Sequence, residues 1–175
     1  MCGAILGGLP GRVSKPAARP EPVRLGDVTS EVCRGLQPLF DSAKVNLAVQ
    51  VEAGLVPGLG VPAALRRLMT ALLENAVKYT PGGGTVTVSV RRDRSGQIWE
   101  IADTGCGISE ESIPHIFDRF YRADTSRDRR TGGYGLGLAI ADQIARQHNT
   151  RIEVRSQMGE GTTFFMCFPS SPIEL

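Results

Sequence analysis

The chain has 175 residues, of which 41% are hydrophobic and 22% charged, with a formal net charge of +2. This size leaves room for one domain with a sizeable core and little more. A charge so close to zero gives no sign of a nucleic-acid partner. No apolar stretch approaches the roughly 20 residues that a membrane-spanning helix needs. The four cysteines are scattered, without a zinc pattern or a disulfide framework. We therefore expect a cytoplasmic protein without a membrane span, with any membrane association made through a partner.

The two ends of the chain differ in composition from its middle. Residues 1–22 are rich in Gly, Pro, Ala and Arg and show no hydrophobic periodicity. Such a segment has too little apolar surface to order itself, so we expect a flexible tail or a remnant linker. The sequence places one folded domain over residues 23–170, followed by a short C-terminal tail over 171–175.

The first half of this domain predicts two helices around one strand. Apolar residues recur every four positions over 27–42, which indicates an amphipathic helix, and Pro38 inside it should kink or shorten the last turn. Strict alternation over 45–51 predicts a strand. Pro62 is well placed in the first turn of a second helix, which should run to about Tyr79.

Two hairpins are predicted in the second half. Alternating valines over 86–90 and an apolar run over 97–103 are joined by the turn-forming string Asp-Arg-Ser-Gly at 93–96. A second hairpin should close the domain over 152–167, around Met-Gly-Glu-Gly at 158–161.

Helical segments are also expected between these hairpins. Residues 104–134 are loop-rich, with one short helix around 111–117, and a third long helix should cover 135–147. The total is about five strands and three principal helices in mixed order. This order predicts an α+β fold, a two-layer α/β sandwich.

The second helix carries the first group of candidate functional residues. Asn75, Lys78 and Tyr79 lie at positions i, i+3 and i+4, so an amide, an ammonium group and a ring share one helix face. An amide oxygen suits Mg²⁺, a lysine suits phosphate, and a ring suits a base or a ribose. The alternative is an exposed polar face with a Glu74–Lys78 ion pair.

A carboxylate and two glycines follow the apolar strand over 97–103. The string Asp-Thr-Gly-Cys-Gly-Ile at 103–108 puts Asp103 at the strand end, where its carboxylate can accept a hydrogen bond from the exocyclic amine of adenine. Gly105 and Gly107 would allow backbone to approach a ligand closely. Alone, this string is also compatible with a plain turn after a strand.

Two further motifs follow in the loop-rich region. Aromatics and arginines alternate over 116–124, which alone is compatible with a small hydrophobic cluster flanked by solvated arginines. The string Gly-Gly-Tyr-Gly-Leu-Gly-Leu at 132–138 is a glycine-rich loop that opens a helix and presents free N–H groups to an anion. It lacks the Lys-Ser/Thr of a P-loop.

In this order, the four motifs resemble the N, G1, F and G2 boxes of the histidine kinase branch of the GHKL ATPase superfamily. Gly-Glu-Gly-Thr-Thr-Phe at 159–164 resembles the last glycine box of that family. The resemblance covers about residues 23–169. It implies a Bergerat-type sandwich with a mixed five-stranded sheet and three main helices. The aromatic-arginine motif is the one that separates histidine kinases from gyrases, heat-shock chaperones and mismatch-repair ATPases.

The resemblance also implies residue roles and the cofactors ATP and Mg²⁺. Asn75 would be the Mg²⁺ ligand and Lys78 would meet the phosphates, which makes these two the implied catalytic residues. Residues 122–134 would form a lid over ATP. The implied nucleotide-binding residues are Asn75, Lys78, Tyr79, Asp103, Gly105, Gly107, Ile108, Gly133, Gly135, Leu136, Gly137, Leu138 and Thr162.

The sequence departs from the family pattern in three places. Ala71 stands where histidine kinases usually carry a second asparagine and related hydrolases a glutamate, so Mg²⁺ binding should be weaker and water activation from that position is excluded. Asn-Thr at 149–150 replaces the Gly-Gly pair that the family favours after the residue matching His148. The helical domain with its phospho-accepting His-Glu pair has no counterpart, and both His115 and His148 are expected to be structural.

These observations predict a protein-histidine kinase that binds Mg-ATP and phosphorylates a histidine in trans. The acceptor would lie on a partner's helical dimerisation and phosphotransfer domain, with a response regulator downstream. A non-catalytic ATP-binding regulatory module is the alternative favoured by Ala71. An anti-sigma-type serine kinase is a third hypothesis, disfavoured by the aromatic-arginine motif.

Overall fold

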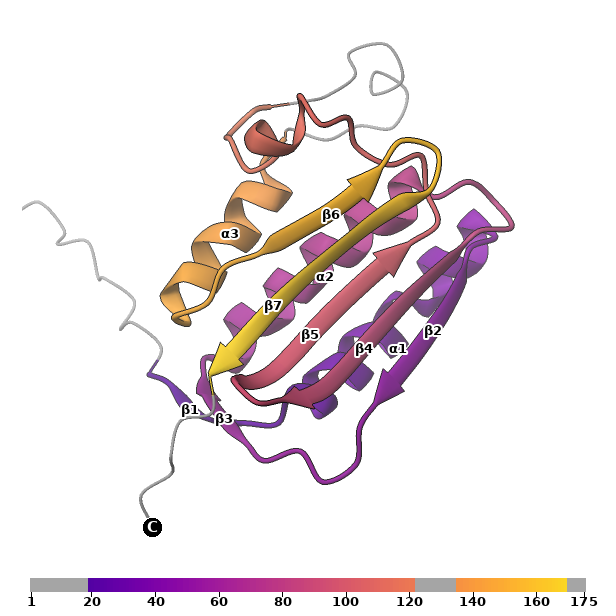
Figure 1. The fold of residues 1–175 in the computed structure, drawn as a ribbon. Coiled ribbons are helices and arrows are strands. Elements are labelled where there is room, and N and C mark those ends of the chain that lie inside the picture. The colour runs from indigo at the N-terminus through magenta and orange to yellow at the C-terminus, as the bar shows by residue number, and fades with distance from the viewer. Residues whose placement is uncertain (1–18, 122–134, 170–175) are drawn as a thin grey trace, which may run out of the picture.

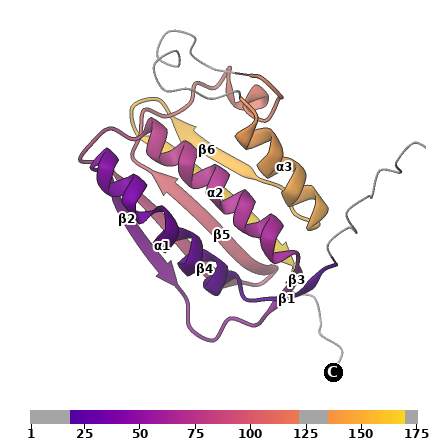
Figure 2. The same ribbon diagram turned by 180° about the vertical axis from the view of Figure 1, so that it is seen from behind.

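The computed structural model describes residues 19–121 and 135–169, which form a five-stranded sheet covered on one face by three helices. Figure 1 looks onto the open face of the sheet and Figure 2 onto the helices. The helices are α1 (Leu25–Ala43), α2 (Pro62–Tyr79) and α3 (Gly137–Gln147). The strands of the sheet are β2 (Asn46–Val51), β4 (Thr85–Asp93), β5 (Gly96–Asp103), β6 (Glu153–Gln157) and β7 (Gly161–Pro169). The predicted α+β two-layer sandwich is confirmed.

The strand order in the sheet is β2-β4-β5-β7-β6. All neighbours are antiparallel except β2 and β4, which run parallel. A parallel pair needs a long crossover, and residues 52–84 supply it with α2, which packs on the covered face of the sheet and runs roughly along the strands. The predicted hairpin between β4 and β5 has the expected two-residue turn, because Asp93 pairs with Gly96.

The core lies between the sheet and the helices. Every second side chain of β5, of β7 and of β4 as far as Val90 points towards the helices and is buried, following the two-residue period of a strand. Trp99 is fully buried, its indole N–H donates a hydrogen bond to the Thr29 hydroxyl of α1 over 2.7 Å, and its ring meets Phe168 edge-on at 5.7 Å. This side chain therefore joins the helical layer to the sheet.

Helices α1 and α3 have boundaries that differ from the sequence prediction. Pro38 does not shorten α1, which continues to Ala43, because Phe40 is fully buried and anchors the last turn to the core. Lys44 then closes the helix in the left-handed conformation, with its N–H bonded to the Asp41 carbonyl. Helix α3 begins two residues later than expected, because Gly135 has a φ of +66°, which is incompatible with a helix.

Other elements are shorter than expected or were not expected at all. The predicted short helix is a single 3₁₀ turn, η1 (Ile113–His115). Strands β1 (Glu21–Val23) and β3 (Gly58–Gly60) form a separate two-stranded sheet. Each has only three residues, too few to show a hydrophobic period. Strand β1 begins two residues before the start that the sequence assigns to the domain.

His148 fixes the junction between this small sheet and the helices. Its Nε2 accepts a hydrogen bond from the Val61 N–H (3.0 Å), at the start of α2, and its Nδ1 lies 2.8 Å from the Ile144 carbonyl of α3. Asn149 follows with a φ of +56°, the left-handed conformation that lets asparagine replace the glycine favoured by the family. Both ring nitrogens of His148 therefore have structural partners.

No helix among the described residues combines the length and hydropathy that crossing a bilayer would require.

Candidate functional site

A row of polar side chains crosses one end of the sheet. Asp103 on β5 is paired with Thr162 on β7, which is in turn paired with Ser156 on β6. The neighbouring row on the same face contains Ile101 and Phe164, both fully buried under the helices. The helix-covered face thus changes from apolar to polar at its last row, which predicts a binding role for that row rather than a packing role.

Asp103 is buried and has two backbone donors on the same oxygen. Its Oδ1 accepts hydrogen bonds from the N–H groups of Gly105 (2.9 Å) and Thr162 (3.2 Å). Among the described residues, none makes a hydrogen bond to Oδ2. Burial raises the pKa of Asp103, while the bonds from Gly105 and Thr162 act in the opposite direction. One oxygen is therefore held by the protein and the other is available to a donor on a ligand.

The glycines after Asp103 are required by protein packing. A Cβ on Gly105 would lie 2.5 Å from the Tyr79 carbonyl oxygen, at the end of α2. A Cβ on Gly107, whose φ is +72°, would lie 2.1 Å from the Gln157 carbonyl oxygen. The Cys106 N–H also donates to the Tyr79 carbonyl over 3.2 Å. The loop thus fits between α2 and the β6–β7 turn, so close approach of a ligand is not the only reason for these glycines.

Ser156 connects this loop to the sheet, and the sequence analysis did not identify it. Its Oγ accepts a hydrogen bond from the Ile108 N–H (2.8 Å), donates one to the Gly161 carbonyl (2.9 Å) and lies 2.9 Å from the Thr162 hydroxyl oxygen. Strand alternation could have indicated its inward position, two residues after Val154, but not its three partners.

The predicted polar face of α2 runs beside this loop. Asn75 and Lys78 are half-buried and Tyr79 is 38% exposed. The Lys78 ammonium lies 4.9 Å from the centre of the Tyr79 ring, a cation–π contact. Asn75 makes no side-chain hydrogen bond with any described residue, so its amide oxygen is available to a metal ion. Ala71, one turn earlier, packs against the core and offers no ligand atom.

At the start of α3, Leu136 occupies the N-cap position, and within the described residues no side-chain hydrogen bond caps the backbone N–H groups there. Gly135 is held by the chain itself, since its carbonyl accepts the Phe120 N–H (3.0 Å) and a Cβ would lie 2.8 Å from the Tyr121 carbonyl oxygen. By contrast, a Cβ on Gly137 would meet no described atom within 4 Å. Leu136 and Leu138 are half-buried on either side of it. An uncapped first turn with an open glycine is suited to an anion.

The remaining predicted residues fall outside the described part of the chain. Gly133 and the lid over 122–134 belong to this group. Within the described ranges, no cluster of three or more His, Cys, Asp or Glu side chains could hold a metal ion. A Mg²⁺ ion bound through one amide oxygen, phosphate oxygens and water is compatible with the donors that are present.

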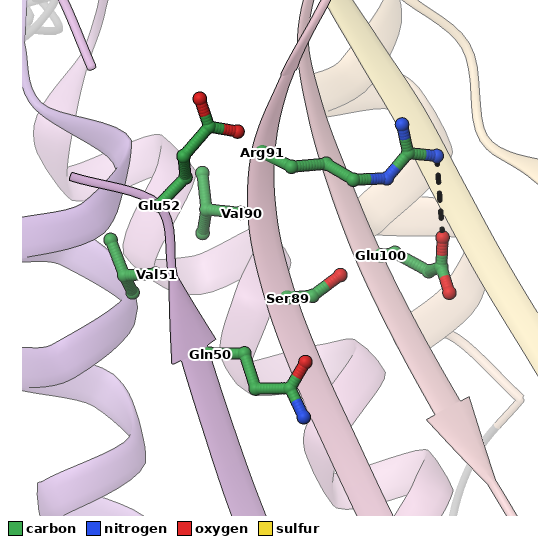
Figure 3. Close-up of a pocket in the computed structure, with 7 residues that line it drawn as sticks. All are labelled: Gln50, Val51, Glu52, Ser89, Val90, Arg91 and Glu100. Atoms are coloured by element: carbon green, nitrogen blue, oxygen red, sulfur yellow. Dashed lines mark ion pairs between the residues drawn. The ribbon is translucent and has the colours of Figure 1, made fainter. Parts of the chain in front are cut away.

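A depression lies on the open face of the sheet, away from the residues described so far (Figure 3). Polar and charged side chains line it, including Gln50, Glu52 and Ser89, and an ion pair of 3.7 Å joins Arg91 to Glu100. Glu100 and Asp103 are an odd number of residues apart on β5, so their side chains point to opposite faces. This depression is therefore separate from the polar row.

Comparison with known proteins identifies the family of the chain. Residues 60–172 match the family described as histidine kinase-, DNA gyrase B-, and HSP90-like ATPase. The chain is 46% identical to the sensor histidine kinase YkoH of Bacillus subtilis over 104 residues, which are 59% of this chain and 22% of that protein. It is 37% identical to the sensor-like histidine kinase SenX3 of Mycolicibacterium smegmatis over 152 residues, which are 86% of this chain and 39% of that protein.

Solved structures show the same fold. The mycobacterial sensor histidine kinase MprB has a TM-score of 0.72 at 27% identity, over 88% of this chain and 99% of that chain. ShkA in complex with AMPPNP has a TM-score of 0.73 at 24% identity, over 88% of this chain and 32% of that chain. The chain spans 22–39% of the length of the curated relatives YkoH and SenX3. The chain therefore belongs to the family of histidine kinase-, DNA gyrase B- and HSP90-like ATPases, and its relatives there are sensor histidine kinases.

Proposed function

We propose that the chain binds Mg-ATP between α2, the 103–108 loop and the start of α3, and transfers the γ-phosphoryl group to a histidine of a partner protein. The partner would supply a helical dimerisation and phosphotransfer domain, and a response regulator would receive the phosphoryl group next. The observation that carries the proposal is Asp103, a buried carboxylate with one oxygen held by backbone and the other open to a donor.

The adenine base would be recognised at the polar row. The exocyclic amine of adenine is a donor, and Asp103 Oδ2 is an acceptor without a partner among the described residues. The Thr162 N–H holds the same carboxylate from the neighbouring strand. A buried acceptor that is left unpaired by the wrong base is a strong source of discrimination, because the desolvation of the carboxylate is then not compensated.

The phosphates would lie between α2 and α3. Lys78 supplies positive charge and the uncapped first turn of α3 supplies N–H groups and the positive end of the helix dipole. The Asn75 amide oxygen would ligate Mg²⁺, which neutralises phosphate charge when bound. Phosphoryl transfer depends mainly on such positioning and charge stabilisation, and these residues provide no nucleophile of their own.

The acceptor histidine is proposed to come from the partner. His148 has both ring nitrogens engaged by Val61 and Ile144, so it is not available to a phosphoryl group. His115 is exposed, and its Nδ1 lies 3.1 Å from the Asp118 carboxylate, a contact that was not predicted from the sequence. Phe120, 70% exposed with a φ of +66°, is the proposed docking contact for the partner, with Phe117 and Tyr121 beside it.

Ala71 supports the second candidate, a regulator that binds ATP without transferring phosphate. Its methyl group packs against the core, so α2 offers Mg²⁺ only one amide instead of the usual two. Weaker Mg²⁺ binding would leave nucleotide binding intact and lower the transfer rate.

The test mixes the purified chain with γ-labelled ATP, Mg²⁺ and isolated helical dimerisation domains of sensor histidine kinases. Acid-labile, alkali-stable labelling of such a domain supports histidine phosphorylation, and acid-stable, alkali-labile labelling supports the serine kinase. ATP binding without transfer to any acceptor supports the regulator. Asp103→Asn is the matched control, because it keeps the shape of the side chain and should reduce the labelling in step with its lower ATP affinity.

A further inference from the structure

The hydrogen-bonding capacity of the Ser156 hydroxyl is completely used. A serine hydroxyl has one proton to donate and two lone pairs to accept. The Gly161 carbonyl is an acceptor only, so Ser156 gives its proton to that oxygen over 2.9 Å. One lone pair receives the Ile108 N–H over 2.8 Å. The remaining lone pair faces the Thr162 hydroxyl oxygen, 2.9 Å away.

This arrangement fixes the direction of the Thr162 hydroxyl. Because Ser156 has no second proton, Thr162 must be the donor in the contact between the two hydroxyls. The Thr162 proton is thereby committed to Ser156, and towards any other group Thr162 Oγ1 can only accept. The direction follows from the partners of Ser156 and does not depend on a ligand.

The polar row therefore presents acceptors at two neighbouring positions. Asp103 and Thr162 are paired across β5 and β7, so their side chains lie side by side on the face covered by helices. Asp103 Oδ2 is an acceptor, and the Thr162 hydroxyl is now an acceptor as well. At its 6-position, a 6-aminopurine offers donor protons to these two acceptors, whereas a 6-oxopurine offers there a carbonyl oxygen that they repel.

We infer that Ser156 is a positioning residue that helps the site select a 6-aminopurine, because it holds the Thr162 hydroxyl as an acceptor. The inference rests on the proposed nucleotide site. Without Ser156, the Thr162 hydroxyl can rotate and donate to a 6-oxo group. Loss of Ser156 should therefore weaken ATP binding more than binding of inosine triphosphate (ITP).

The surroundings of Ser156 allow a conservative replacement. Ser156 lines a depression together with Ile108, Glu110, Gln157 and Met158, so open space adjoins this residue. Ser156→Thr keeps the hydroxyl and should keep the preference for ATP. Thr29→Val is the matched control, because it removes another buried, hydrogen-bonded hydroxyl that lies in the core beside Trp99.

The experiment measures the Kd of the full chain for ATP and for ITP by displacement of a fluorescent ATP analogue. Ser156→Ala should lower the preference for ATP over ITP by about three- to tenfold, the range of one lost hydrogen bond. Ser156→Thr and Thr29→Val should keep the parent's preference. In a Thr162→Val background, Ser156→Ala should change the preference no further, because the hydroxyl that it orients is gone.

An equal loss of affinity for both nucleotides in Ser156→Ala would overturn the inference and leave Ser156 a purely structural residue. A parent that binds ATP and ITP equally well would overturn it too. A parent that binds neither nucleotide would overturn the proposed function itself. Should Ser156→Ala fail to fold, Thr162→Val provides the test instead. The inference requires this variant to have a lower preference for ATP over ITP than the parent, and an unchanged preference contradicts it.

Discussion

At the scale of single residues, Asp103 shows a conflict between folding and binding. Burial raises its pKa in the folded state above the unfolded value. Its contribution to stability is therefore most favourable below the unfolded pKa and is lost as the pH rises through the raised folded pKa. The ionised form of Asp103 is therefore the form that the proposed binding needs and that burial in the folded state disfavours.

Replacing this carboxylate by its neutral isostere should separate the two effects. In Asp103→Asn, the amide oxygen can still accept the N–H groups of Gly105 and Thr162, and no charge is buried. We expect the free energy of unfolding at pH 7 to equal or exceed that of the parent, while ATP affinity falls about ten- to a hundredfold. Denaturant unfolding and nucleotide titration measure the two quantities. Unchanged ATP affinity in the folded variant would remove Asp103 from the site.

The same pKa predicts a pH dependence of binding. Protonated Asp103 can no longer accept at both oxygens, so ATP affinity should decline as the pH falls through its raised pKa. Asp103→Asn should be insensitive in that range. The check is a series of ATP titrations at decreasing pH, with circular dichroism to verify that the protein remains folded. A parent profile as flat as that of the variant would argue against the carboxylate as the reader of the base.

His148 has a structural role that predicts a loss of stability. Glutamine can replace only one of its two hydrogen bonds, so His148→Gln should leave either the Val61 N–H or the Ile144 carbonyl without its partner. We expect the free energy of unfolding to fall by about 1–3 kcal/mol. His115→Gln, at an exposed site, is the control and should unfold like the parent. Equal stability of both variants would contradict the bridging role.

At the scale of elements, two glycines of the site are expected to serve different purposes: Gly137 serves nucleotide binding, and Gly107 serves the stability of the fold. Gly137→Ala in the open first turn of α3 should leave the unfolding free energy unchanged or raise it by up to about 1 kcal/mol, while nucleotide affinity falls about tenfold or more. Gly107→Ala places a Cβ 2.1 Å from a carbonyl oxygen and should cost on the order of 3 kcal/mol. Thermal unfolding and ATP titration of both variants test this. A destabilised Gly137→Ala would mean that the protein itself needs this glycine.

Elements with a clear period could be predicted from the sequence, and those fixed by tertiary contacts could not. Helix α2 begins and ends at the predicted Pro62 and Tyr79, because its apolar residues repeat without interruption. Strands β1 and β3 are too short to show a period, and the effect of Pro38 depends on the burial of Phe40.

The residues of the candidate site fall into the same two groups, those indicated by local sequence and those defined by tertiary contacts. Asp103 and the face of α2 carry chemistry that residue type and spacing reveal. The reason for Gly105 is its contact with Tyr79, and the role of Ser156 depends on three partners from other segments. No local pattern encodes such contacts, because they arise only when β6, β7 and the 103–108 loop come together.

At the scale of the whole molecule, the chain alone should not label itself on histidine. An acceptor must approach the γ-phosphate in line and within about 3–3.5 Å, and His148 is held between α2 and α3. Transfer should require an added helical domain, and His115→Gln should transfer to it as well as the parent does. Acid-labile labelling of the isolated chain that disappears in His115→Gln would instead make His115 the acceptor.

The buried contact of Trp99 with Thr29 and Phe168 gives the molecule an intrinsic spectroscopic probe. Trp99 is the only tryptophan of the chain, so its fluorescence reports the separation of α1 from the sheet without a label. It lies four residues before Asp103 on β5, about 13 Å away along the strand. Nucleotide should therefore leave its emission nearly unchanged, whereas unfolding should shift it to longer wavelength. A variant that no longer binds nucleotide but keeps the parent's emission has therefore lost its ligand and not its fold.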